Sequence, residues 1–118
     1  MDTLVAERCV ACDRNAPRLT DEELEALRSQ IPEWQIIDVE GVPHLVRTYK
    51  VKDFAQALEL TNRIGALAEA EKHHPAILTE WGKVTVSWWT HKIRGLHRND
   101  VIMAAKTDDA ARSLAPAS

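Results

Sequence analysis

Histidines are the clearest candidates for chemistry in this chain, which contains five of them. An imidazole ordinarily titrates near neutral pH, so it can act as a general acid or as a general base. His73 and His74 are adjacent, and they follow a helical pattern that Pro75 brings to an end. The negative end of the helix dipole at that position favours the protonated imidazole. The pair therefore indicates acid–base chemistry.

Three further residues could join this pair in one pocket. Glu69 lies one helical turn before His73 on the same helix face, His91 ends a predicted strand, and Asp100 begins the last predicted helix. If the long helix packs across the sheet, its C-terminal end comes near the end of the last strand. We therefore expect one proton-transferring site formed by Glu69, His73, His74, His91 and Asp100. The competing interpretation of His73 and His74 is a solvated helix end.

A metal site is the main chemical alternative. Adjacent histidines rarely bind one ion together, and the helical zinc spacing of metalloproteases is i, i+4. Cys9 and Cys12 have the spacing of half a zinc site or of a redox pair, but no second cysteine pair accompanies them. We expect a site with no metal, and we interpret these cysteines as part of an unneeded or weakly structured N-terminal arm. We interpret His44 and His97 as surface or loop residues.

Four tryptophans are many for a chain of 118 residues. We expect Trp34 and Trp88 to pack in the core, whereas Trp81 and Trp89 could form a flat wall for a planar heterocycle. Glycine-rich phosphate loops and the G-x-S-x-G elbow are absent from the sequence. Nucleotide-phosphate transfer and serine hydrolysis therefore have no support.

Capping signals and hydrophobic periodicity predict the elements that would position these residues. A capping box at Thr20–Glu23 starts a short helix. Strands are predicted over 34–39, 45–51, 76–81 and 84–90, a long helix over 52–72, and a last helix from 97–99 onward. The long helix repeats Phe54, Leu58, Thr61, Gly65 and Ala68 at helical spacing, and Ala57, Ile64 and Leu67 flank this stripe. This order predicts an α+β fold, a four-stranded antiparallel sheet with three helices on one face. An arm would span 1–19, a single domain 20–114 and a frayed tail 115–118.

Charge and hydropathy exclude some partners. The net charge is −3, and the short basic cluster Lys92, Arg94, His97 and Arg98 is closed by Asp100. It suits a small anionic or polar ligand better than nucleic acid, which usually binds along a basic stripe. No apolar run approaches the roughly 20 residues that a membrane helix needs, and the first residues lack the pattern of a signal peptide. We expect a cytoplasmic protein that binds neither nucleic acid nor membrane.

The middle of the chain carries a longer pattern. Glu69-x-x-x-His73-His74-Pro75 is followed by Trp81, His91 and Asp100 without a gap. This pattern resembles the signature of the pterin-4a-carbinolamine dehydratases, and the resemblance extends from about Thr20 to Ser113. The arm with Cys9 and Cys12 also looks like the N-terminus of bacterial members.

The resemblance implies a function and a state of assembly. The substrate would be the 4a-hydroxytetrahydropterin that an aromatic amino acid hydroxylase, such as phenylalanine hydroxylase, leaves behind. The products would be quinonoid dihydropterin and water, with no metal or organic cofactor. Members form homodimers or homotetramers around a four-stranded antiparallel sheet with helices on one side.

The resemblance also implies roles for individual residues. His73, His74 and His91 would surround the hydroxyl-bearing carbon. Glu69 and Asp100 would orient the histidines or hold the amide and amino edge of the pterin. Trp81 occupies an aromatic position of the signature. Trp89 and Thr90 stand where animal members carry Ser-Thr, and backbone contacts with the substrate are expected there.

Two readings from other functional classes remain open. Animal members of the family also act as dimerisation cofactors of a homeodomain transcription factor, so the fold could serve binding instead of catalysis. The acidic net charge and the bacterial-looking arm argue against that role. The other reading is a metal-binding module built on Cys9, Cys12 and two histidines. Val46 and Trp89, on the sheet face away from the helices, hint at contact between subunits.

Overall fold

The computed structural model describes residues 4–10 and 17–114, and it has the predicted α+β architecture. The elements are α1 (Asp21–Leu27), β1 (Gln35–Val39), β2 (Val42–Lys50), α2 (Phe54–Glu71), β3 (Ala76–Glu80), β4 (Lys83–Trp88) and α3 (Arg98–Arg112). Three short 3-10 helices add η1 (Leu4–Ala6), η2 (Arg28–Gln30) and η3 (His91–Ile93). The predicted capping box is present, since Thr20 accepts from the Glu23 amide and Glu23 accepts from the Thr20 amide.

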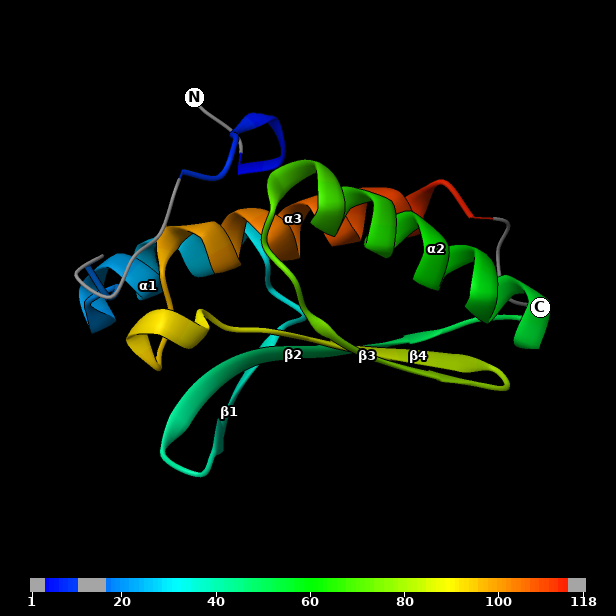
Figure 1. Cartoon of the computed structure of the whole chain (residues 1–118), viewed down its shortest axis with the longest axis horizontal. Helices are drawn as coiled ribbons and strands as arrows, with labels where there is room; N and C mark the ends of the chain where they lie inside the picture. The colour runs from blue at the N-terminus through cyan, green and yellow to red at the C-terminus, as the bar shows by residue number, and fades with distance from the viewer. Residues whose placement is uncertain (1–3, 11–16, 115–118) are drawn as a thin grey trace.

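The four strands form one antiparallel sheet in the order β1-β2-β4-β3, and the three α-helices lie on the same side of it (Figure 1). The central pair β2 and β4 aligns Leu45 with Trp88 and Tyr49 with Val84. These four side chains are buried, because they face the helices. The predicted core position of Trp34 and Trp88 is confirmed.

Helix α2 is capped at both ends, and the paired histidines follow its C-terminal cap. Asp53 caps its start by accepting from the Gln56 amide, and Lys72 ends it in the left-handed region at φ 54°. The predicted stripe is confirmed at Ala68 and at the flanking Ala57 and Ile64, which are buried, but it was wrong for Phe54 and Leu58, which are 43% and 44% exposed. The buried face of the helix consists of Ala57, Leu60, Ile64 and Ala68, because these residues face the sheet and α3.

Helix α3 is buried between the sheet, α2 and the N-terminal arm. Its core residues run without a break from Val101 to Ala105. The arm packs on it through η1, whose Leu4 is fully buried. The described part of the arm is therefore packed against the domain and not weakly structured, while Cys12 lies outside the described residues. No helix among the described residues combines the length and apolar character needed to cross a membrane.

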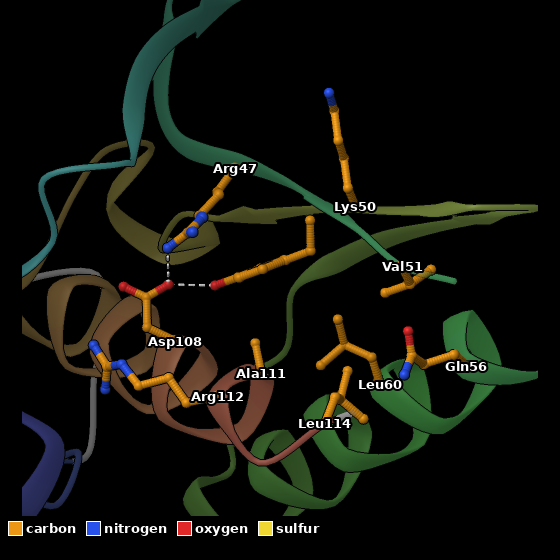
Figure 2. A pocket seen from close by; sticks show the side chains of 10 residues that line it. Arg47, Lys50, Val51, Gln56, Leu60, Asp108, Ala111, Arg112 and Leu114 are labelled. Carbon is orange, nitrogen blue, oxygen red and sulfur yellow. Dashed lines mark hydrogen bonds and ion pairs between the residues drawn. The ribbon is translucent and has the colours of Figure 1, made fainter. Parts of the chain in front are cut away.

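Asp108 joins the last turns of α3 to the sheet. One of its carboxylate oxygens accepts from the Trp34 indole at 3.0 Å, from the Arg47 guanidinium at 2.7 Å and from the Tyr49 hydroxyl. Figure 2 shows the Arg47 side chain reaching down to Asp108 from the sheet. Burial, together with the hydrogen bond to Asp108, raises the pKa of Tyr49. The carboxylate therefore satisfies three donors of the core at once.

Replacing Asp108 should test this junction. We expect Asp108→Ala to lower the free energy of unfolding by about 3–5 kcal/mol, because it leaves the Arg47 charge and two buried donors without their acceptor. Urea denaturation followed by tryptophan fluorescence measures the change. The matched control is Asp109→Ala, which removes only an exposed ion pair with Arg112 and should change stability by less than about 0.5 kcal/mol. Equal losses in the two variants would contradict the assignment.

Candidate active site

A cavity of about 480 Å³ lies where the C-terminal end of α2, the segment after β4 and the start of α3 meet. Its lining includes His73, His74, Thr90 and His91, so the structure brings together the three histidines that the sequence singled out. Asp100 and Glu69 lie behind this lining as hydrogen-bond partners of two of the histidines. The volume falls within the range of small-molecule sites.

His73 is held by a fully buried carboxylate. Its Nε2 lies 2.6 Å from Oδ1 of Asp100, and its ring stacks on the indole of Trp88 at 5.7 Å. The other oxygen of Asp100 accepts from the Thr90 hydroxyl at 2.7 Å and from the His97 amide at 2.9 Å. These contacts fix both the position and the plane of the His73 ring, which pre-organises the imidazole for proton transfer.

His74 and His91 are more open to solvent. Nε2 of His74 lies 2.5 Å from Oε2 of Glu69, in a pair whose side chains are 61% and 78% exposed. Solvent screens such a pair, so it orients the ring more than it stabilises the fold. His91 has no carboxylate partner among the described residues, and its ring is tilted against Trp89 at 4.6 Å. The site thus combines two imidazoles that have a carboxylate partner with one that has none.

The carboxylates also select the tautomer of their histidines. An ionised carboxylate only accepts hydrogen bonds, so Nε2 of His73 and of His74 must donate. In the neutral ring this leaves Nδ1 as the unprotonated nitrogen, and in the charged ring Nδ1 carries the second proton. Gain or loss of a proton at Nδ1 would therefore leave the carboxylate contact of each ring intact.

Of the residues expected to contact a substrate besides the histidines and acidic groups, Thr90 lines the cavity, whereas Trp81 and Trp89 do not. Trp81 lies in the turn between β3 and β4, is 74% exposed and does not line the cavity. Trp89 stacks on His44 at 3.9 Å and contacts His91, at the edge of the site. The backbone of Thr90 pairs with Gly95 in both directions, while its hydroxyl orients Asp100. Their roles toward a substrate stay predictions.

The interpretation of His44 as a surface or loop residue was wrong, since it is buried in β2, whereas His97 does lie in the loop before α3, with its side chain buried. His97 caps α3, with its Nδ1 accepting from the Asn99 amide at 3.0 Å. Burial lowers the pKa of His97, and the Asp100 charge opposes this effect. Burial and the neighbouring His91 lower the pKa of His44. The spacing of His97 and Asp100 is that of a capping box, a signal present in the sequence.

The N-terminal arm and two further side chains complete the cavity, and sequence reasoning missed them. The lining includes Arg8, Cys9 and Val10, together with Glu71 and Asn99. The arm is separated by 62 positions from Glu71 and by 89 from Asn99, as the hydrogen bonds between them show. No local pattern signals contacts over such separations.

Cys9 does not have the properties of a metal ligand. Its thiol lies 3.9 Å from the Asn99 carbonyl, and burial, followed by the Glu71 charge, raises its pKa to about 12. A metal-binding cysteine needs a thiolate, which this environment disfavours. Among residues 4–10 and 17–114, no group of three or more histidine, cysteine and acidic side chains could hold a metal ion.

A second cavity, of about 250 Å³, lies on the side of α3 that carries Asp108 (Figure 2). No histidine lines it, and its buried carboxylate is already bonded to three core donors. Apolar side chains from β2, α2 and the end of α3 make up much of the remaining wall, among them Leu60 and Leu114. We attribute this cavity to the packing of the fold and not to proton-transfer chemistry.

Comparison with known proteins identifies relatives along almost the whole chain. The family described as "Pterin 4 alpha carbinolamine dehydratase" matches residues 17–110. A protein of Syntrophotalea carbinolica, provisionally named a pterin-4-alpha-carbinolamine dehydratase, is 62% identical over 92% of this chain and 96% of its own. A protein of Gloeobacter violaceus with a similar provisional name is 56% identical over 92% and 93%.

A solved structure supports the same relationship. The crystal structure of a transcriptional coactivator/pterin dehydratase from Brucella melitensis superposes with a TM-score of 0.72 at 30% identity. The match covers 80% of this chain and 99% of the Brucella chain. The overall fold of this chain therefore occurs in an experimentally determined relative.

The buried His97 should make stability depend on pH. The unfolded chain takes up a proton near the ordinary pKa of 6.5, whereas the folded chain does so only at lower pH. Between these values the unfolded state binds more protons, so the free energy of unfolding should fall as the pH drops below about 6.5. His97→Asn keeps a helix cap and should reduce that slope in urea denaturations between about pH 7.5 and 5.

His44 should contribute to the slope with the same sign, because its pKa is also lowered. The double variant His97→Asn, His44→Phe should therefore flatten the dependence further, with the phenyl ring keeping the stack on Trp89. An unchanged slope in both variants would show that these histidines are not the source.

Proposed function

This chain belongs to the pterin-4a-carbinolamine dehydratase family, and we propose that it is a lyase that converts a 4a-hydroxytetrahydropterin to quinonoid dihydropterin and water. One observation carries the proposal: three imidazoles line a single cavity, and two of them are held by carboxylates. Elimination of water needs both a proton donor and a proton acceptor near one carbon, and this set of groups offers both.

The proposed reaction is a general acid–base elimination. An imidazolium protonates the hydroxyl on C4a, the C–O bond breaks and water leaves. A neutral imidazole removes the proton from the neighbouring N5, and the N5–C4a double bond of the quinonoid product forms. Both protons pass between substrate and histidines, so each turnover leaves one proton more on the base and one fewer on the acid. Exchange with solvent through the exposed His74 or His91 restores the starting state.

The two carboxylates differ in what they can touch. Asp100 is fully buried behind His73, so we assign it the positioning of that ring and not contact with the substrate. Glu69 is exposed beside His74, so it can orient His74 and also reach a bound pterin. Thr90 supports Asp100 through its hydroxyl. Trp81 and Trp89 remain candidates for contact with the ring or with another subunit.

The cellular role follows from the chemistry of the substrate. A 4a-hydroxytetrahydropterin arises when an aromatic amino acid hydroxylase, such as phenylalanine hydroxylase, oxidises its tetrahydropterin. Removal of water returns the pterin to a form that a reductase can recycle. We propose this role for the chain in the cytoplasm, without a metal or organic cofactor. The family match and the provisional names of the relatives support the pterin substrate.

Turnover by histidine variants tests the mechanism. We expect His73→Ala, His74→Ala and His91→Ala each to lower the dehydration rate, and the loss at His73 to be on the order of 10²-fold or more. The substrate is generated in place by phenylalanine hydroxylase, and its decay is followed by ultraviolet absorbance. Asp100→Asn should lower kcat with little change in KM, because it misorients His73 without touching the pterin.

His44→Phe is the matched control for these variants. It removes an imidazole outside the cavity lining while keeping the aromatic stack on Trp89. We expect its dehydration rate to stay near that of the wild type. If the wild-type protein is folded and does not accelerate the decay, the proposed lyase activity is wrong.

We further propose that the protein assembles as a homodimer or homotetramer. Phe54 and Leu58 form an exposed apolar stripe on α2, and Leu78 is exposed on the edge strand β3. Exposed apolar stripes of this kind mark interaction surfaces. The same stripe could hold a helix of another protein, an alternative favoured by the word coactivator in the name of the Brucella relative.

Light scattering during gel filtration distinguishes a homo-oligomer from a single chain that binds another protein. The wild type should elute as a multiple of the 13.3 kDa chain, and Leu58→Glu should shift it toward the single chain without unfolding it, since the side chain is half exposed. Ala26→Glu places the same charge on an exposed site of α1 and should leave the mass unchanged. A wild-type monomer that recovers a transcription factor from host lysate in stoichiometric yield would favour the alternative.

A further inference from the structure

The N-terminal arm is attached to the end of α2 at one wall of the active-site cavity. Oε1 of Glu71 accepts from the Cys9 amide at 2.7 Å, and Oε2 accepts from Nε of Arg8 at 2.6 Å. The Glu71 side chain is almost buried. The Cys9 amide, followed by the bond to Arg8, lowers the pKa of Glu71. Glu71, which lies two residues before His73, thus bonds two consecutive residues of the arm, Arg8 and Cys9, beside the histidine pair.

A second attachment fixes the arm to the start of α3. The side-chain amide of Asn99 donates to the Val10 carbonyl at 2.8 Å and accepts from the Val10 amide at 3.1 Å. Asn99 is buried and precedes Asp100, so the arm is bonded next to the carboxylate that holds His73. Glu7 adds a two-pronged ion pair with Arg98. The arm is therefore a fixed wall of the cavity and not a loose terminus.

The lining of the cavity carries three cationic side chains. Arg8, Lys72 and Lys92 all line the cavity. Glu71 is the carboxylate in the same lining, and its two oxygens are already bonded to the arm. Lys72 and Lys92 form no ion pair within residues 4–10 and 17–114. Arg8 is engaged through Nε alone while its side chain is 75% exposed, so the terminal nitrogens of its guanidinium remain open to a ligand.

We propose that the arm is a substrate-binding element, in which Arg8, together with Lys72 and Lys92, binds an anionic group on the side chain at C6 of the pterin. The inference rests on the proposed function, because the histidines fix where C4a must lie. The group would be a phosphate or a carboxylate, both of which match the fork of a guanidinium. Arg8 thereby becomes a specificity residue that lies more than 60 positions from the histidine pair.

Calorimetric titration with stable oxidised pterins tests the inference without relying on turnover. The probes are neutral 6-hydroxymethylpterin, pterin-6-carboxylate and the phosphate monoester of 6-hydroxymethylpterin. We expect one or both anionic probes to bind about tenfold more tightly than the neutral one, with the preference falling as salt is raised. The probe with the larger preference identifies the anion as carboxylate or phosphate.

Variants assign the preference to the arm. Arg8→Met should reduce it by about tenfold, and Arg8→Lys should restore part of it by returning the charge. Lys92→Met, which leaves the arm attachments intact, should lower it as well. Arg112→Met is the matched control, since this exposed arginine lies outside the cavity, and it should leave the preference unchanged.

The outcomes separate this inference from the proposed function. If all three probes bind equally, or if Arg8→Met weakens neutral and anionic probes alike, the anion site is refuted while the dehydration assay decides the lyase activity independently. If no probe binds, the pterin site and the inference fall together. A preference that disappears with Arg8→Met and not with Arg112→Met supports the arm as the binding element.

Discussion

Asp100 is the point at which the active site and the fold meet. Its fully buried carboxylate accepts hydrogen bonds from His73 at the end of α2, from Thr90 after β4 and from the backbone of His97 at the start of α3. A buried polar group is stable only when hydrogen bonds replace the lost water, so these three segments must meet for the Asp100 carboxyl group to be buried. The same requirement that stabilises the start of α3 places His73 at the cavity.

Helix α3 carries a second buried carboxylate near its other end, and the two have different tasks. Asp108 accepts from Trp34, Arg47 and Tyr49, all of which belong to the core or to its edge. It connects α3 to the sheet away from the histidines. Helix α3 is therefore bonded to the active site through Asp100 and to the sheet through Asp108. These two attachments hold the start of α3 in a fixed position beside the end of β4.

The cavity is lined by residues at the ends of helices and strands, and this explains why many of its side chains are polar. The end of α2 supplies His73 and His74, the segment after β4 supplies Thr90 and His91, and the arm supplies Arg8. Helix and strand ends present backbone groups and polar side chains that cannot be buried in the apolar layer. The apolar layer between sheet and helices supplies rigidity instead, as the stacking of Trp88 on the His73 ring illustrates.

The sequence by itself determined the α+β fold class, the order of the elements and the histidines that line one cavity. These follow from local information: periodicity along each element, the capping box at Thr20–Glu23 and the break at Pro75. Tertiary structure alone decided that Phe54 and Leu58 of α2 are exposed, that the side chains of His97 and His44 are buried, and that Asp100 holds His73 while Glu69 holds His74. It also decided that the arm forms a wall through Glu71 and Asn99. Contacts between segments 60 to 90 positions apart depend on how whole layers pack, and no pattern among neighbouring residues encodes that packing.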